Sequence, residues 1–359
     1  MSASSPAPPL RIGHFNFDVP AIQGALSGFS DLPMRRVARS FGCVYAMNEV
    51  VLDELVLLPG KLQAEILNVA DDDHPVAGQL LGGVPETFAG AAKLLVQAGY
   101  DVVDINFGCP VKKVVGRHRG GYLLSEPRTA LEIVSRVRDA VPSHVPLTIK
   151  MRRGVDDTTL AKEQFDEIFE GAFARGVDAI CVHGRTVQQR YVGPSRRSFL
   201  GELKARHPDK VILGSGDMFS AQDAQDLLTQ TGVNGAWIGR GAIGAPWIFR
   251  QLRQLLVDGV TPTLPTFSEQ RAAIWLHHRE HVRVHGTSLG NRMTRKVAIK
   301  YAEAHPHSAA VVDAFCRVTD SDTVEALLQR FYDEAYADDH FGPVVAKAGP
   351  GNLVAAGAC

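Results

Sequence analysis

The sequence predicts an α/β fold, a (β/α)8 TIM barrel with a C-terminal all-helical domain. Three observations predict it. Eight short apolar runs alternate with amphipathic helical stretches over about 240 of the 359 residues. The stretches between successive runs are long enough for helical crossovers, which are right-handed and make the strands parallel. After Pro265 the alternation stops and only helical periodicity continues. A doubly wound parallel sheet is the structural alternative.

Each strand is predicted where a short, mostly apolar run is bounded by glycine, proline or polar turn residues. The eight runs are residues 21–26, 43–50, 76–82, 101–107, 146–151, 178–184, 210–216 and 235–241. Helices are predicted where apolar residues recur every three to four positions. They cover residues 30–41, 85–99, 127–141, 160–176, 220–232 and 245–259, and residues 268–335 are helical without intervening strands.

Composition divides the chain into four segments. Residues 1–13 and 339–359 are rich in small residues, Gly and Pro, so we expect a disordered N-terminus and a flexible tail. Residues 14–262 are predicted to form the barrel and residues 263–338 the helical domain. A content of 45% hydrophobic and 21% charged residues is ordinary for a globular protein. No apolar run approaches the roughly 18 residues of a membrane span, so we expect a cytoplasmic protein with no membrane partner.

Cys109 differs from the other cysteines in its setting. The five cysteines are dispersed and include no Cys-x-x-Cys pair, which argues against disulfides and against a thiolate metal site. Cys109 lies in a Gly-Cys-Pro loop directly after the strand predicted at 101–107, and the next ten positions contain five basic residues: Lys112, Lys113, Arg117, His118 and Arg119. A cationic setting is expected to lower the pKa of a thiol. We therefore predict a reactive thiol, either a nucleophile or a proton donor.

Polar residues gather at the carboxyl ends of the predicted strands, where parallel barrels carry their chemistry. They are Gln79, Asn106, Cys109, Lys150, Arg152, His183, Arg185, Asp217 and Arg240. The last two strands end in Gly-Ser-Gly-Asp and Gly-Arg-Gly before helices, which predicts a phosphate site built from backbone N–H groups. A phosphate there suits flavin mononucleotide, because Lys150 could then stabilise the negative charge of the reduced ring.

Two further motifs lack the context that their usual function requires. GRGAIG at 239–244 matches a dinucleotide fingerprint, but no further strand follows it. HHREH at 277–281 matches a zinc-peptidase signature, but no third ligand is evident and arginines flank it. We expect HHREH to be a solvated basic face, with no metal bound.

The helical segment carries a concentration of positive charge. Residues 271–300 contain seven Arg and Lys residues against one acid, Glu280, although the whole chain has a net charge of −1. A basic patch on a neutral chain is typical of contact with a phosphate backbone. We therefore expect a nucleic-acid partner.

Together the motifs resemble those of the tRNA-dihydrouridine synthases of bacterial type, FMN-dependent barrels with a C-terminal helical tRNA-binding domain. The resemblance covers roughly residues 20–335 and rests on DINFGCPVKKVVGRHRGGYLL, IKMRRGVDD, VHGRTVQQRYVG, GSGDM and IGRGAIGAPWIF. It implies that NADPH (or NADH) reduces the flavin and that flavin N5 delivers hydride to C6 of a D-loop uridine in tRNA. It also implies that Cys109 is catalytic and protonates C5.

The resemblance implies roles for the remaining candidates. The flavin contacts would be Gln79, Lys150 and His183, with its phosphate near Ser215, Gly216, Asp217, Gly239 and Arg240. The base and the RNA would meet Asn106, Arg152, Arg185, Lys112, Lys113, Arg292, Arg295 and Lys296. No metal and no obligate protein partner is implied. Departures from the family pattern, such as GALSGFSD in the first flavin loop, leave the modified uridine undetermined.

Two other functions are alternatives. One is a flavin-dependent reductase or dehydrogenase of a free pyrimidine or dihydroorotate, which the basic helical segment argues against because a free base needs no RNA platform. The other is a tRNA-binding homologue with weakened or lost catalysis. The presence of both Cys109 and Lys150 argues against it.

Overall fold

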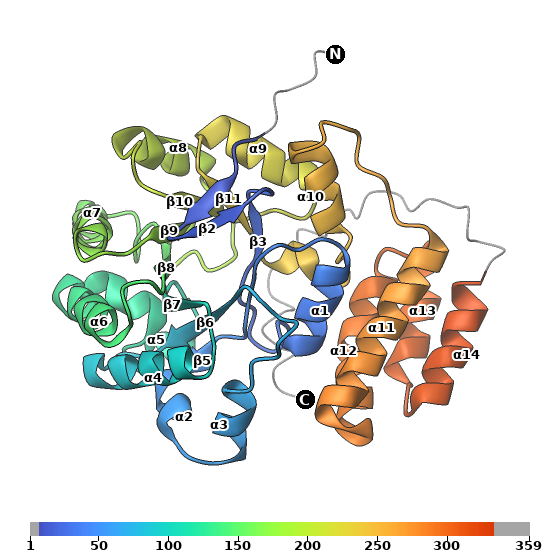
Figure 1. Cartoon of the computed structure of the whole chain (residues 1–359). Helices are drawn as coiled ribbons and strands as arrows, with labels where there is room; N and C mark the ends of the chain where they lie inside the picture. Colours follow the sequence, from blue (N-terminus) through green and yellow to red (C-terminus); the bar gives the residue numbers. More distant parts are fainter. Residues whose placement is uncertain (1–6, 334–359) are drawn as a thin grey trace.

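The computed structural model describes residues 7–333. Eight strands form a closed parallel barrel, ringed by helices, and a group of helices lies beside it (Figure 1). Around the barrel the strands are β3 (Ala21–Gln23), β4 (Ala46–Met47), β6 (Val76–Leu81), β7 (Val102–Phe107), β8 (Leu147–Arg152), β9 (Ala179–His183), β10 (Ile212–Ser215) and β11 (Gly235–Ile238). Pairing of β11 with β3 closes the ring, so the barrel is confirmed and the doubly wound alternative is wrong.

Side chains on each strand alternate between the barrel interior and the surrounding helices, as the pleat requires. Ala77, Val102, Ala179 and Leu213 belong to the apolar cluster inside the barrel. Their neighbours in sequence, such as Val103 and Ile212, pack in the larger cluster that the helices cover. The alternation therefore assigns positions 79, 104, 106 and 183, further along the same strands, to the interior. Position 150 of β8 is assigned there too, because Ile149 and Met151 on either side of it pack in the outer cluster.

The helices around the barrel begin where the sequence supplies caps. They are α1 (Leu32–Ser40), α4 (Pro85–Gln97), α6 (Pro127–Ala140), α7 (Thr159–Ala174), α8 (Arg197–Arg206), α9 (Ala221–Thr231) and α10 (Ile248–Leu256). Asp31 accepts a hydrogen bond from the N–H of Met34 at the start of α1, and Ser220 and Asp223 form a capping box on α9. Such caps satisfy N–H groups that have no partner within the helix.

A short hairpin closes the end of the barrel where the strands begin. Its strands are β1 (Leu10–Ile12) and β2 (Phe15–Phe17). Leu10, Ile12 and Phe17 are buried against the interior cluster. The expectation of disorder through residue 13 is therefore wrong for residues 10–12, because three residues suffice for a strand when alternate side chains are buried. Residues 1–6 and the predicted tail at 339–359 lie outside the described part of the chain.

Several short elements of the connections were not predicted. They are β5 (Val51–Leu52), α2 (Asp53–Leu57), α3 (Lys61–Ile66), α5 (Lys112–Val115) and the 3-10 helices η1 (Gly120–Ser125) and η2 (Arg240–Ala242). β5 extends the pairing of β6 near the carboxyl end of that strand, with Val51 opposite Leu80. The loop that contains Cys109 lies between β7 and α5, so a regular element precedes it and another follows it.

The C-terminal helices are α11 (Phe267–His285), α12 (Thr287–Ala302), α13 (Ser308–Cys316) and α14 (Ser321–Phe331). They share an apolar core that includes Phe267, Tyr301 and Phe315, and Trp247 of the barrel joins it. Helix α11 packs against α1, so the two parts of the chain meet along these helices (Figure 1). None of the helices between residues 7 and 333 is both long and apolar enough to cross a bilayer.

Candidate active site

A chain of hydrogen bonds in the barrel interior leads to the Cys109 loop. The carboxylate of Asp104 accepts from Gln79 Nε2 at 2.7 Å. Gln79 Oε1 then accepts from Asn106 Nδ2 at 2.8 Å. Asn106 Oδ1 accepts from the backbone N–H groups of Gly108 and Cys109 at 2.9 and 3.0 Å. Each hydrogen bond fixes the orientation of the next side-chain amide, so ionised Asp104 determines how the amides of Gln79 and Asn106 are oriented. Asn106 in turn holds the loop after β7.

Asp104 and Lys150 are ionisable groups in this interior. Burial raises the pKa of Asp104 to about 6, although Thr148 donates a hydrogen bond to it at 2.5 Å and Gln79 donates another. Burial lowers the pKa of Lys150, whose ammonium lies 5.7 Å from the centroid of the Trp237 ring. Lys150 of β8 lies opposite Asn106 of β7 in the strand register. The interior therefore places a cation next to the amide that supports Cys109.

The Cys109 thiol is half-buried. Burial raises its pKa, and this effect exceeds the opposite influence of the Val111 N–H and of Arg152. The prediction that the basic residues after Cys109 lower the pKa of its thiol is therefore wrong. Lys112 and Lys113 point to solvent on α5, and Arg119 pairs with Glu54 at 2.6 Å. A thiol that stays protonated suits a proton donor better than a nucleophile, which requires the thiolate.

Arginines at the carboxyl ends of the strands make the rim of the barrel positive. The guanidinium groups of Arg152 and Arg240 lie 5.5 and 4.8 Å from the centroid of the Tyr191 ring. Arg185 donates to both oxygens of Asp217, at 2.9 and 2.6 Å, and Arg240 donates to one of them at 3.3 Å. Two of these arginines share one carboxylate, while Arg152 donates to the carbonyls of Gly108 and Thr186. The rim therefore keeps an excess of positive charge, which favours an anionic ligand.

His183 is neutral in this setting. Burial, together with the charges of Lys150, Arg152, Arg185 and Arg240, holds its pKa well below the ordinary value. Its Nδ1 faces the backbone N–H of Arg185 at 3.1 Å and therefore accepts a hydrogen bond. In a neutral imidazole the proton is then on Nε2, so His183 presents a hydrogen-bond donor to the site.

The loops after β10 and β11 form a backbone cradle. Ser215, at the end of β10, is paired with Trp237 of β11, so the residues that follow the two strands lie side by side. No backbone hydrogen bond within residues 7–333 uses the N–H of Gly216, Asp217 or Gly239. A Cβ on Gly239 would meet only Leu26, at 3.7 Å, so the backbone there is open. Free N–H groups beside Arg240 fit a phosphate group.

The RNA candidates of the helical domain differ in exposure. Arg292 points to solvent, and Arg295 is half-buried. The ammonium of Lys296 donates to the carbonyl of Gly28 and lies 4.1 Å from the centroid of the Phe29 ring. The structure therefore assigns Lys296 to the contact between α12 and the barrel, and leaves Arg292 and Arg295 as the accessible cations of this group.

The HHREH motif is not a solvated basic face. His277, His278 and His281 are buried between α11 and its neighbours, whereas Arg279 is exposed. The prediction failed because the face of α11 that packs against α1 carries histidines rather than aliphatic side chains. Glu280 of α11 also faces α1, where it accepts from Arg36 at 2.9 Å, and it accepts from Arg283 at 2.7 Å.

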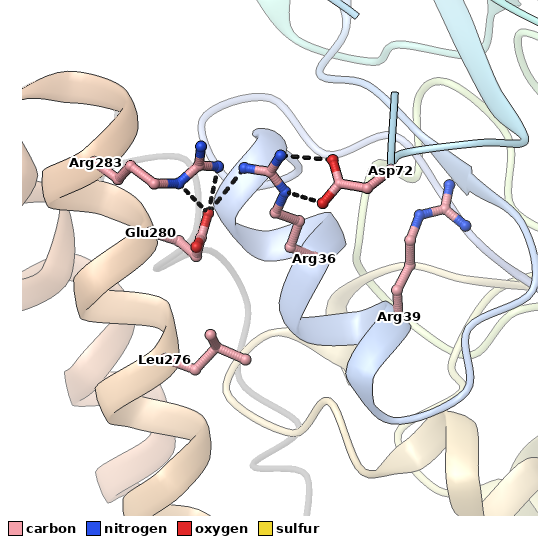
Figure 2. A pocket seen from close by; sticks show the side chains of 6 residues that line it. All are labelled: Arg36, Arg39, Asp72, Leu276, Glu280 and Arg283. Atoms are coloured by element: carbon pink, nitrogen blue, oxygen red, sulfur yellow. Dashed lines mark hydrogen bonds and ion pairs between the residues drawn. The ribbon is translucent and has the colours of Figure 1, made fainter. Parts of the chain in front are cut away.

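A cavity of about 380 Å³ lies between α1 and α11 (Figure 2). It is lined by Arg36, Arg39, Asp72, Leu276, Glu280 and Arg283. Arg36 also pairs with Asp72 at 2.6 Å. The arginine charge in this cavity is thus largely balanced by carboxylates.

Sequence reasoning missed four residues of the site: Asp104, Thr148, Tyr191 and Trp237. Asp104 and Thr148 could have been found, because they share the interior side of their strands with Asn106 and Lys150 at a period of two. Tyr191 lies in a loop, and no pattern in the sequence indicates that arginines flank its ring. Trp237 reads as an apolar strand residue, and its contact with Lys150 depends on closure of the barrel.

Comparison with known proteins identifies related chains. Residues 24–336 match the family model described as dihydrouridine synthase. The chain is 33% identical over 330 residues to a probable tRNA-dihydrouridine synthase of Rhodobacter capsulatus, covering 91% of this chain and 99% of that protein. It is 30% identical over 325 residues to tRNA-dihydrouridine synthase B of Pseudomonas aeruginosa, covering 90% and 96%.

Solved structures share the fold at low identity. Morphinone reductase in complex with tetrahydroNAD matches with a TM-score of 0.54 and 12% identity, over 71% of this chain and 92% of that one. Histamine dehydrogenase from Rhizobium sp. 4-9 matches with a TM-score of 0.55 and 14% identity, over 76% of this chain and 50% of that one. These two likenesses concern the barrel architecture.

Proposed function

Because the chain belongs to the dihydrouridine synthase family, we propose that it reduces the C5=C6 bond of a D-loop uridine in tRNA, with FMN as cofactor and NADPH as reductant. The relatives named above as tRNA-dihydrouridine synthases support the tRNA substrate. The observation that carries the proposal is the Cys109 thiol, held by Asn106 and kept protonated by burial. A tRNA substrate also favours a cytoplasmic location.

FMN, when bound and reduced by NADPH, would supply a hydride to C6 of the uracil ring. The negative charge that then develops at C5 and O4 is neutralised when the Cys109 sulfur gives its proton to C5. One C–H bond forms at each carbon, the C5=C6 double bond is lost, and the thiolate regains a proton from water. A general acid must hold its proton until this moment, and the raised pKa of the thiol meets that requirement.

The remaining candidates position the reactants. Gly216, Asp217, Gly239 and Arg240 would hold the phosphate of FMN by backbone N–H groups and charge. Lys150, Gln79 and His183 line the interior at the ring, and the Lys150 cation would stabilise a negatively charged reduced ring. Arg152 and Arg185 belong to the positive rim, which would receive the phosphates near the target uridine, with Lys112 and Lys113 exposed nearby on α5.

The test is dihydrouridine mapping by mass spectrometry. Unmodified tRNA is incubated with the purified chain, FMN and NADPH, and then digested. A gain of two hydrogens at one D-loop position is the expected result. Cys109→Ala is the matched control, because it should keep flavin absorbance and NADPH oxidation but lose this gain.

Other outcomes would change the assignment. A yellow preparation that oxidises NADPH but modifies no tRNA would favour the flavin-dependent enzyme of free pyrimidines. Reduction of uracil and oxidation of dihydroorotate would then be assayed. A preparation that binds tRNA but no flavin would favour the non-catalytic homologue. NADH is assayed in parallel with NADPH, because the reductant is part of the proposal.

A further inference from the structure

We propose that Asp31, His277 and His281 form a binding site for a divalent transition metal, with Zn²⁺ as the best match, at the contact between the barrel and the helical domain. Asp31 precedes α1, and the two histidines lie one turn apart on α11. All three side chains are buried, and one potential ligand atom of each lies within 4.8 Å of those of the others. The inference does not depend on the proposed reaction.

The spacing of the ligand atoms fits a tetrahedral ion. His281 Nε2 and His285 Nε2 each lie 3.4 Å from the same Asp31 oxygen, Oδ2. Zn²⁺ binds nitrogen and oxygen at roughly 2.0–2.1 Å, so neighbouring ligands on a tetrahedron are about 3.3 Å apart. N–H···O bonds are usually about 2.9–3.0 Å long, so both contacts are long for hydrogen bonds. Two imidazole nitrogens therefore face one carboxylate oxygen at the spacing expected around a shared ion.

His277 supplies an independent indication. Its Nε2 is buried and has no hydrogen-bond partner among the described residues, which is costly for a polar atom. A metal ion would satisfy this nitrogen.

The groups behind the ligands are arranged as in metal sites. His277 Nδ1 lies 3.3 Å from the Tyr301 hydroxyl, and His281 Nδ1 lies 3.3 Å from the Thr294 hydroxyl. Asp31 Oδ1 accepts from the Met34 N–H at 3.0 Å, which turns Oδ2 toward the histidines. Each ligand is thus oriented through its second polar atom, as ligating histidines and carboxylates usually are.

The donor set favours Zn²⁺ over Mg²⁺ or Ca²⁺, because imidazole nitrogen suits late first-row metals while the alkaline-earth ions require oxygen ligands. Half-buried His285 lies outside this cluster of three, but it also contacts Asp31 Oδ2 and continues the series on α11 at four-residue spacing. A fourth ligand from His285 would close the site, as in structural zinc centres. The bound ion would tie α11 to the start of α1, next to the Gly28 loop that Lys296 also contacts.

The experiment uses the full-length chain. The protein is treated with a chelator, dialysed, and titrated with ZnCl₂ against a competing indicator, and bound metal is measured by mass spectrometry. About one Zn²⁺ per chain is expected. Co²⁺ in its place should give the intense visible absorption of a tetrahedral centre.

Three variants locate the ion. Asp31→Asn keeps a side chain suited to the start of a helix, and His281→Gln keeps a polar side chain. Each should weaken Zn²⁺ binding by more than the ~10- to 100-fold typical of losing an outer hydrogen-bond partner. His307→Gln is the control, because this histidine at the start of α13 is exposed and lies outside the proposed ligand set.

Two results would overturn the proposal. One is a wild-type chain that takes up neither Zn²⁺ nor Co²⁺. The other is an affinity that Asp31→Asn and His281→Gln leave unchanged, since the ion would then bind elsewhere. Circular dichroism checks that each variant is folded, and if one is not, the wild-type titration with and without chelator still decides.

Discussion

Replacing Asp104 by Asn should stabilise the fold above neutral pH. Asp104 has a pKa of about 6 in the folded chain, against an ordinary value of 3.8. The folded state therefore binds this proton more tightly than the unfolded state, so the contribution of this group to stability falls as pH rises from 3.8 to about 6. At pH 7 the ionised carboxylate lowers the free energy of unfolding by about 3 kcal/mol relative to a neutral group.

The Asn side chain can retain the geometry. Its Oδ1 would accept from Gln79 Nε2, and its Nδ2 would donate to the Thr148 hydroxyl, which can accept as well as donate. The free energy of unfolding of Asp104→Asn should thus exceed that of the wild type at neutral pH, and the difference should grow by about 1.4 kcal/mol from roughly pH 5 to pH 8. Asp104→Leu should instead destabilise the fold, by about 1–3 kcal/mol for each group left without a partner.

Urea unfolding at several pH values, followed by circular dichroism, measures these differences. Glu163→Gln removes an exposed carboxylate of α7, and it should show no comparable pH-dependent gain. The reasoning is refuted if Asp104→Asn is less stable than the wild type at about pH 8, or if the difference does not grow with pH. Either result would mean that the fold favours the ionised carboxylate despite its burial.

Three further predictions concern the site and the RNA surface. Cys109→Ala should slow uridine reduction ~100- to 10,000-fold in single-turnover assays, because the proton donor is lost; wild-type turnover would exclude that role. Arg292→Glu should weaken tRNA binding and flatten its dependence on salt, while Arg317→Glu, a change at the exposed residue that follows α13, should leave the salt slope unaltered if α12 is the RNA surface. Gly24→Ala should lower the melting temperature markedly, because its Cβ would lie 1.6 Å from Trp237 Nε1; an unchanged melting temperature would mean that the indole moves freely.

The order of the barrel strands was predictable because strands buried on both sides read as apolar runs whatever their partners are. The polar residues at the strand ends were predictable for a related reason. A charged side chain such as Lys150 at the end of an otherwise apolar strand is not expected in an apolar core. Parallel strands bring all such ends to one face of the barrel.

Contacts between distant residues were not predictable. The pKa of Cys109 depends on how deeply the loops after β7 bury the thiol, and a run of lysines beside it in sequence says nothing about that depth. The burial of His277 and His281 depends on the packing of α11 against α1. The role of Lys296 depends on the position of the Gly28 loop. For the two histidines and for Lys296, a second segment far away in sequence decides the environment.

The hairpin formed by β1 and β2 closes one end of the barrel with Leu10, Ile12 and Phe17, so water reaches the interior from the other end. Along β7 the interior side chains change from Val102 through Asp104 to Asn106, from the closed end to the open one. The local dielectric constant should rise along the same path, which makes the depth of a position as important as its chemistry. A charge tolerated at the rim would be expensive two residues further in, so substitutions in this barrel should be chosen by depth before residue type.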